Sequence, residues 1–321
     1  MSNVLVTGGA GFIGSHLVAE LVRKGHRVRI LDNFSTGQRH NLSGILSRVR
    51  ISTNDVRDLK AVRGAVKGID LVYHLAAVSS VPQSVDDPLT TFDANLQGTW
   101  NVLEASRLGK VGRVVFVSSA SVYGADCKMP FRESAQLKAS SPYAASKLIG
   151  EQLCGLYGRL YGLETVALRF FSVYGPRQNR FSQYANVIPA FCTAVITGKR
   201  PTIYGDGSQT RDFVYVGDIV RACVQAGRRR KSVGEVINVG TGRQVSIVEL
   251  LERIQSVLGT NIEPKFAPKK PGDDPHTCAD IGNAKKLLGM TKLTPFDVGL
   301  KKTAQWFGDI IKQESDLGTK K

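Results

Sequence analysis

Short apolar runs rich in β-branched residues recur along the first half of the chain, and between them apolar residues are spaced three or four positions apart. Runs of the first kind predict strands, and spacing of the second kind predicts helices. The central runs are apolar at nearly every position, which indicates strands buried on both faces of a parallel sheet. The predicted strands are NVLVTG (3–8), RVRILDN (27–33), RVRIST (48–53), LVYHLAA (71–77), RVVFVSS (113–119) and ETVALRFF (164–171).

The alternation predicts an α/β fold of the Rossmann type, with a doubly wound parallel sheet. A helix is expected from Phe12 to Lys24, ending at Gly25, because glycine readily adopts the left-handed conformation that closes a helix. After about residue 172 the pattern breaks into shorter elements, with one more strand-like run at 235–240. We therefore expect a larger domain over 1–171, with a segment returning near 213–242, and a smaller, interleaved α/β domain in the remainder of 172–321.

Composition places the chain among water-soluble globular proteins: 42% of its 321 residues are hydrophobic and 22% are charged. The start, MSNVLVTGGAGF, has no charged leader before an apolar run, and no run reaches the roughly 18 apolar residues of a membrane span, so a cytoplasmic protein is expected. The five cysteines are scattered without CxxC or Cys/His spacing, which predicts free thiols, mostly in the core, and no metal site: Cys127, Cys154, Cys192, Cys223 and Cys278.

The formal net charge of +16 favours anionic partners. Apart from RRRK at 228–231 and KK at 269–270, however, the basic residues are dispersed and lack interleaved aromatic residues, so nucleic-acid binding is not expected. A solvated basic surface, with part of the charge serving an anionic substrate, is the interpretation that fits this distribution.

Three glycines, Gly8, Gly11 and Gly14, follow the first predicted strand in TGGAGFIG. Such glycines allow a sharp turn, a close approach of backbone to a pyrophosphate, and tight packing of the next helix on the strand. The second strand ends at Asp32, where a carboxylate accepts hydrogen bonds from a ribose 2′-hydroxyl and repels a 2′-phosphate. No arginine stands beside Asp32, so the segment predicts an NAD site in preference to an NADP site.

Tyr143 and Lys147 are four residues apart in SPYAASKLIGEQ. Ser141 can cap a helix that begins with proline, which places both side chains one turn apart on one face. The preceding strand ends at Ser118 and Ser119, at the edge where open α/β sheets bind ligands. The combination predicts a catalytic site in which Ser119 passes a proton between a substrate and Tyr143.

Tyrosine acts as a base only when its phenol is ionised. A reference pKa near 10 must fall by about 3 units, or roughly 4 kcal/mol, for the phenol to be largely ionised at neutral pH. One lysine in water does not suffice. Lys147 together with the positive nicotinamide ring of NAD in a closed site can suffice, because opposite charges within a few ångströms favour the anion.

Nearly the whole chain resembles the extended short-chain dehydrogenase/reductase superfamily and, within it, the NAD-dependent nucleotide-sugar 4-epimerases. The similar segments occur in family order: TGGAGFIGSHL, LDNFSTG, HLAAVSSVPQSVDDP, NLQGTWNVLEA, VSSASVYG, PYAASK, LRFFSVYGPRQ, YGDGSQTRDFVYV and NVGTG. Beyond the glycines, Asp32, Tyr143 and Lys147, the resemblance implies NAD contacts at Phe12, Ile13, Asn33, Ser35, Thr36, Gly37, Asp55, Val56, Leu75, Ala76, Ala77, Asn95 and Phe170.

The resemblance implies inversion of C4 in a UDP-hexose. Tyr143, as phenolate, takes the proton of the 4-hydroxyl while C4 passes its hydride to NAD; the 4-keto sugar then turns over and receives the hydride on its other face. Relatives that dehydrate or decarboxylate resemble TDEVYG or TSEVYG, with acids where this chain has Ala120 and Ser121. The expected reaction interconverts UDP-glucose with UDP-galactose, and also UDP-GlcNAc with UDP-GalNAc.

Family positions also imply the substrate contacts. Asn186 and Arg211 match residues that hold the diphosphate, and Arg211 has the charge and fork geometry for it, although pairing with Asp212 or Asp218 is an open alternative. Thr202 and Tyr204 match the segment along the uracil. The remaining positions expected to contact substrate are Ser80, Ser119, Ser121, Tyr143, Ser172, Lys270, Asp273 and Thr277.

Three of these positions bear on the sugar. Ser172 replaces the usual asparagine of RYFN, and a small hydroxyl residue there also occurs in relatives acting on UDP-glucuronate, so that substrate stays open. Lys270 replaces the usual arginine before PGD and offers a point charge in place of a fork. Thr277 aligns with a pocket wall where tyrosine excludes a 2-acetamido group, so the smaller threonine predicts that UDP-GlcNAc and UDP-GalNAc fit.

The sequence leaves two other functions open. UDP-glucuronate 4-epimerase follows from Ser172, and a non-catalytic member that binds NAD or RNA is the second alternative. Such members typically lack the tyrosine or the lysine, and both are present here. The resemblance also implies a homodimer formed through two helices, expected around 93–108 and 143–161.

Overall fold

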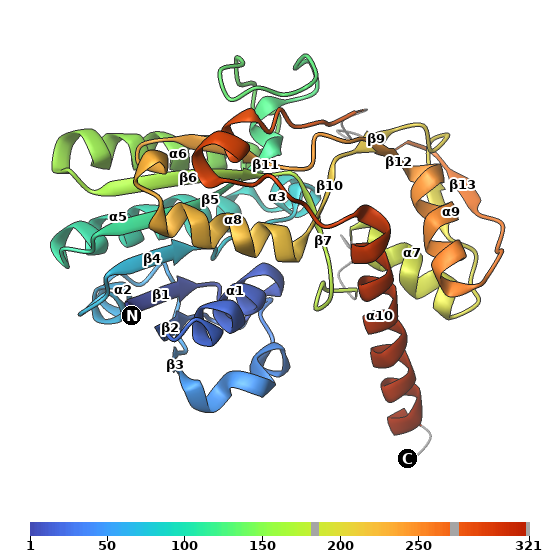
Figure 1. Ribbon diagram of the computed structural model, residues 1–321, viewed down its shortest axis with the longest axis horizontal. Helices are drawn as coiled ribbons and strands as arrows, with labels where there is room; N and C mark the ends of the chain where they lie inside the picture. The colour runs from blue at the N-terminus through green and yellow to red at the C-terminus, as the bar shows by residue number, and fades with distance from the viewer. Residues whose placement is uncertain (181–185, 270–275, 319–321) are drawn as a thin grey trace.

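The structure is a computed structural model that describes residues 1–180, 186–269 and 276–318. Its larger part is a seven-stranded parallel sheet with strand order β11-β6-β5-β4-β1-β2-β3 (Figure 1). The expected α/β class with a doubly wound parallel sheet is confirmed, and every strand of this sheet lies within a run predicted from the sequence. These strands are β1 (Asn3–Thr7), β2 (Arg27–Leu31), β3 (Val49–Ser52), β4 (Leu71–His74), β5 (Arg113–Ser119), β6 (Glu164–Phe170) and β11 (Val236–Val239).

Helices cover both faces of this sheet (Figure 1). On one face α1 (Phe12–Arg23) and α8 (Val216–Arg228) pack against Val4 and Val6, and on the other α2 (Leu59–Ala65), α5 (Gly98–Leu108) and α6 (Pro142–Tyr161) pack against Leu5. Because alternate strand residues are buried on opposite faces, the strands are apolar at nearly every position.

Shorter helical segments connect these elements. The expected end of the first helix at Gly25 is confirmed, with α1 ending at Arg23 and Gly25 at φ 81°. The short segments are η1 (Arg39–Arg48), α3 (Val81–Asp86), α4 (Pro88–Phe92), the π-helical η2 (Asp93–Gln97), η3 (Ala120–Tyr123), η4 (Arg230–Ser232) and the π-helical η5 (Ala284–Leu288).

A second, smaller core lies beside the carboxyl ends of the sheet strands (Figure 1). It contains α7 (Val187–Ile196), α9 (Ile247–Leu258) and the amino-terminal half of α10 (Phe296–Gly318), and three short strand pairs border it. The pairs are β7 (Ser172–Tyr174) with β10 (Phe213–Tyr215), β8 (Thr202–Tyr204) with β13 (Lys265–Ala267), and β9 (Thr210–Arg211) with β12 (Val245–Ser246). The chain leaves the sheet after β6, returns for α8 and β11, and leaves again at α9.

One buried carboxylate joins these returning segments. Asp212 is fully buried, and it accepts hydrogen bonds from Thr241 N (2.7 Å), Thr241 Oγ1 (2.6 Å), Gly242 N (2.9 Å) and Ala279 N (3.0 Å). Burial raises the pKa of this carboxyl, and the four hydrogen bonds act in the opposite direction. Asp212, which follows β9, therefore fixes the turn after β11 and the segment 276–281 relative to each other.

The cysteines and the helices bear on two further expectations. All five cysteines are free, and Cys154, Cys192 and Cys223 are buried, as predicted. Within the described ranges, no helix combines the length and the apolar character that a membrane crossing requires.

Candidate active site

The glycine-rich turn brings the first helix onto the first strand with no space for side chains. A Cβ on Gly14 would lie 2.1 Å from the carbonyl oxygen of Gly8, and a Cβ on Gly8, whose φ is 68°, would lie 2.8 Å from Ala76 N. Helix α1 has no acidic residue in its first turn, and its N-cap, Gly11, provides no side-chain acceptor. The first amide groups of α1, at Phe12 and Ile13, are therefore free of competing carboxylates and can bind an anion.

Asp32 closes the other side of this turn. Its carboxylate is 7% exposed and accepts hydrogen bonds from Ala10 N (2.8 Å, Oδ2) and Phe34 N (2.8 Å, Oδ1). Gly37 has to be small, because a Cβ there would lie 2.8 Å from the same carboxylate. Each carboxylate oxygen has a second lone pair, which is available to a ribose hydroxyl.

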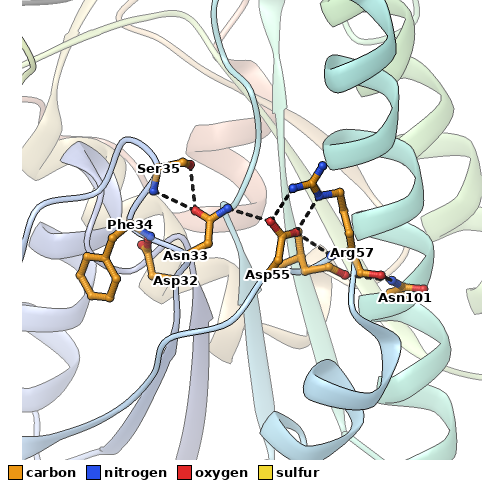
Figure 2. Close-up of polar contacts among 8 residues, drawn as sticks. Asp32, Asn33, Phe34, Ser35, Asp55, Arg57 and Asn101 are labelled. Atoms are coloured by element: carbon orange, nitrogen blue, oxygen red, sulfur yellow. Dashed lines mark hydrogen bonds and ion pairs between the residues drawn. The ribbon is translucent and has the colours of Figure 1, made fainter.

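Figure 2 shows a polar chain that continues from this loop towards α5. Asn33 Nδ2 donates to Asp55 (2.8 Å) and Asn33 Oδ1 accepts from Ser35 Oγ (2.8 Å), while Arg57 binds both oxygens of Asp55 at 2.9 and 3.0 Å. The hydrogen bonds from Arg57 are the main reason that the pKa of Asp55 falls to about 2. Sequence reasoning included Asp55 and missed Arg57, although the two stand only two positions apart.

The other residues expected near NAD line the carboxyl ends of the strands. Leu75, Ala76 and Ala77 follow β4, and the amides of the first two donate to Thr7 Oγ1 at 3.2 Å. Asn95, 2% exposed on η2, receives a hydrogen bond from Val78 N (2.8 Å). Phe170 ends β6, Thr36 lies in the exposed loop after Ser35, and the Val56 carbonyl accepts from Asn101 on α5. These residues, the glycine-rich turn and the buried carboxylate of Asp32 together fit NAD.

Helix α6 positions the predicted catalytic pair. Ser141 Oγ accepts a hydrogen bond from Ala144 N (3.1 Å), which is the predicted cap. Lys147 is 4% exposed; its Nζ donates to the carbonyl of Val117 (2.8 Å) and lies 5.9 Å from the ring centre of Tyr143. Burial lowers the pKa of Lys147 to about 8, and the nearby Cys154 and Glu151 oppose this shift.

Tyr143 has a raised pKa, chiefly because of burial, and a hydrogen bond from Ser119 opposes the shift. Ser119 Oγ accepts from Ser121 N (3.2 Å) and Ser121 Oγ (2.9 Å), which leaves its own proton available for the phenol oxygen of Tyr143. The three residues predicted to be catalytic are thus brought together. Lys147 alone does not bring the pKa of Tyr143 below its ordinary value, in agreement with the expectation that one lysine does not suffice.

A buried polar network that the sequence did not reveal lies one turn further along α6. Glu151 accepts from Arg169 at 2.9 and 2.7 Å and from Ser118 Oγ at 2.5 Å, and Arg169 Nη1 donates to Tyr123 Oη (2.9 Å). Ser118 therefore points into the protein, away from a substrate, and Ser119 is the strand-end serine available for chemistry.

The expected substrate residues form two groups. Ser172, Arg211 and Thr277 lie around Asp212: Ser172 N donates to the Asp212 carbonyl (3.0 Å), and Thr277 Oγ1 accepts from Asp212 N (3.4 Å). Arg211 donates to the carbonyl of Thr210 (2.8 Å).

The second group is spread over other elements. Asn186 is exposed at the start of α7, Thr202 and Tyr204 lie on β8, and Ser80 caps α3 by accepting from Gln83 N (3.2 Å). Lys270 and Asp273 lie outside the described residues.

The chain belongs to the NAD dependent epimerase/dehydratase family, whose model matches residues 4–240. The UDP-glucose 4-epimerase of Mycolicibacterium smegmatis is 39% identical over 94% of this chain and 97% of its own. A UDP-N-acetyl-α-D-glucosaminuronate decarboxylase of Bacillus cytotoxicus is 37% identical over 95% of this chain and 98% of its own.

Solved structures of relatives show the same fold. A UDP-N-acetylglucosamine 4-epimerase of Methanobrevibacter ruminantium M1, in complex with UDP-N-acetylmuramic acid, is 39% identical with a TM-score of 0.91, covering 97% of this chain and 99% of its own. The UDP-glucuronic acid 4-epimerase of Bacillus cereus, bound to UDP-glucuronic acid and NAD, is 32% identical with a TM-score of 0.89, covering 96% and 99%. NAD is therefore the cofactor, while the relatives act on different UDP-sugars.

Replacing Gly14 with alanine should remove NAD from the protein. The added Cβ has to push the turn away from Gly8 O, and we expect the affinity for NAD to fall at least tenfold, which is a loss of roughly 1.4 kcal/mol or more, so that less NAD co-purifies with the chain. NAD released by acid and measured by absorbance gives the result. Gly44→Ala is the matched control, because a Cβ there meets nothing within 4 Å. Undiminished NAD in Gly14→Ala would contradict this picture of the turn.

Proposed function

We propose that the chain is an NAD-dependent UDP-hexose 4-epimerase that interconverts UDP-glucose with UDP-galactose and UDP-GlcNAc with UDP-GalNAc. The observation that carries the proposal is the convergence of Ser119, Tyr143 and Lys147 beside the NAD turn, in a strand-end motif without an acid. The positions after Ser119 are Ala120 and Ser121, and the Ser121 hydroxyl is bonded to Ser119.

Each of the three side chains has a defined task in this reaction. NAD, when bound, supplies a reversible hydride acceptor. Tyr143 takes the proton of the sugar 4-hydroxyl and returns it, and the Ser119 hydroxyl stabilises the phenolate by donating to its oxygen. Lys147 contributes a buried positive charge near the ring of Tyr143, and with a pKa of about 8 it is mostly protonated at neutral pH.

The absence of an acid at positions 120 and 121 argues for simple epimerisation. Elimination of water requires a group that protonates the leaving hydroxyl, and a serine hydroxyl with an ordinary pKa is a poor donor for that step. Ser121 instead donates to Ser119 and so helps to orient the proton that Ser119 gives to Tyr143. The site is built to move one proton at one sugar oxygen.

The proposed tolerance of an acetamido group rests on Thr277. Its side chain is small and half-buried, and the hydrogen bonds of Thr277 with Thr210 and Asp212 hold it in place. The similarity to a UDP-N-acetylglucosamine 4-epimerase supports this part of the proposal.

UDP-glucuronate is the second candidate substrate. Ser172 begins β7 at the carboxyl edge of the sheet and is half-buried. Its side chain is small and its hydroxyl can donate a hydrogen bond to a carboxylate. The similarity to a UDP-glucuronic acid 4-epimerase supports this alternative.

We also propose a homodimer formed through α5 and α6. Large apolar side chains are exposed along both helices: Trp100 (43%), Ile149 (38%), Leu156 (38%) and Leu160 (63%). The α6 positions 149, 156 and 160 share one face at helical spacing, and α5, which carries Trp100, packs against α6.

The Tyr143→Phe variant should lose the epimerase activity while keeping NAD. Removal of a general acid–base group costs about 100- to 10,000-fold in kcat, and the ring that packs in the site is retained. Product formation from UDP-glucose and UDP-GlcNAc, followed by NMR, measures the loss. Tyr161→Phe, at a tyrosine that is 53% exposed, is the control. Turnover by Tyr143→Phe at the parent rate would refute the mechanism.

Thr277→Tyr should separate the two substrate classes. The larger ring fills the space for a 2-acetamido group, so activity on UDP-GlcNAc is expected to fall at least tenfold while activity on UDP-glucose changes little. The assay compares both sugars and UDP-glucuronate, with the exposed Thr291→Tyr as the control. A parent protein inactive on UDP-GlcNAc would refute the argument from Thr277, and turnover of UDP-glucuronate alone would establish the second candidate.

Light scattering should give a mass of twice the 34.8 kDa chain. Leu160→Asp places a charge in the proposed apolar interface and should yield monomers, because an unpaired charge resists burial. Val298→Asp, at a residue 46% exposed on α10, should leave the mass unchanged. A parent chain that is monomeric at micromolar concentration would overturn the dimer proposal.

A further inference from the structure

Arg177 has an unusual backbone for its residue type. Its φ is 67°, in the left-handed region, and only two other non-glycine residues in the described chain share that region, Phe34 and Lys110. An arginine gains nothing locally from this conformation, because its side chain cannot make the short backbone hydrogen bonds that Asn and Asp make there. Strained backbone of this kind concentrates at functional sites.

The side chain of Arg177 is equally unusual. The guanidinium nitrogen Nη1 is buried without a hydrogen-bond partner among the described residues, and so is Oε1 of the neighbouring Gln178, which is 5% exposed. Burial lowers the pKa of Arg177, and no carboxylate opposes that shift. A buried cationic donor without an acceptor is costly, and such groups in native structures are commonly completed by a ligand.

The segment around Arg177 packs on the first turns of α1. Pro176 O accepts a hydrogen bond from His16 Nε2 (2.9 Å), and a Cβ on Gly175 would lie 3.6 Å from the ring of Phe12. Burial lowers the pKa of His16 to about 4, and the positive charge of Arg177 adds to that effect. His16 is therefore neutral, and it anchors Arg177 beside the helix end that follows the glycine-rich turn.

We propose that the Arg177 guanidinium binds the diphosphate of NAD at the amino terminus of α1. The site combines the free first amides of α1, a helix end without acidic residues, and a half-buried arginine with a buried, unpartnered Nη1 on the segment that packs against Phe12 and His16. Arginine matches a diphosphate in charge and in fork geometry. Neither the glycine-rich motif nor the cofactor contacts expected from the sequence include this residue.

The strain gives this proposal a signature that a structural role lacks. Glycine adopts a φ of 67° freely, so Arg177→Gly should raise the melting temperature of the NAD-free chain above that of Arg177→Met. Both variants should release NAD at least tenfold faster than the parent, because a charge-assisted hydrogen bond contributes about that factor or more. Arg177→Gly should thus be more stable than Arg177→Met while releasing NAD as fast as Arg177→Met does.

Lys110→Gly is the matched control. It also removes one positive charge and the strain of a non-glycine residue at a left-handed φ, but at an exposed turn after α5, so it should leave NAD release unchanged. Exchange of bound NAD for radiolabelled NAD in the holoprotein measures release, and Arg177→Lys, which keeps the charge, should fall between Arg177→Met and the parent. Release from Arg177→Met at the parent rate overturns the proposal.

A second diphosphate, that of the UDP-sugar, is distinguished by a separate measurement. Calorimetric titration of the holoproteins with UDP should give the same affinity for Arg177→Met as for the parent. Weaker UDP binding with unchanged NAD release would overturn the assignment to NAD. Because neither measurement involves turnover of a sugar, the outcome is independent of whether the proposed epimerase activity is found.

Discussion

The buried ion pair between Glu151 and Arg169 is the interaction on which the arrangement of the proposed catalytic residues depends. Both side chains are at most 5% exposed, and the arginine binds both carboxylate oxygens. The pair joins α6 to β6, while Ser118 and Tyr123 bring in β5 and η3. Loss of one member of such a pair typically costs about 3 to 5 kcal/mol, because the remaining charge stays buried. The network thus fixes the end of β5, which carries Ser119, relative to α6, which carries Tyr143 and Lys147.

The same pair shapes the electrostatics of the site. Lys147 is buried one turn before Glu151; burial lowers the pKa of that ammonium to about 8, and Cys154 and then Glu151 oppose the shift. Since Arg169 neutralises Glu151 locally, the tyrosine above is spared a nearby uncompensated negative charge, which would raise its pKa further. Burial still raises the pKa of Tyr143. The site therefore holds a neutral phenol, a proton donor and a lysine, poised for an additional positive charge.

The fold was predictable where the signals were local. The strand runs, the Ser141 cap and the spacing of Tyr143 and Lys147 depend on neighbours within a few positions, and the structure reproduces them. Glu151 and Arg169 are 18 residues apart on different elements, so nothing short of the folded sheet brings them together. A left-handed φ at Arg177 leaves no mark in the sequence, because arginine has no preference for it.

Two buried carboxylates organise the two halves of the site by different means. Glu151 is balanced by an arginine and fixes the residues proposed to transfer the proton, whereas Asp212 is held by four neutral donors and lies among Ser172, Arg211 and Thr277. The two networks meet at Asn238, whose Oδ1 accepts from Tyr123 Oη (2.7 Å) and whose Nδ2 donates to the carbonyls of Phe131 (2.8 Å) and Asp280 (3.4 Å). Asp280 lies in the same segment as Ala279, whose amide donates to Asp212. The positions of Tyr143 and Lys147 and those of Ser172 and Thr277 are therefore coupled through one buried asparagine.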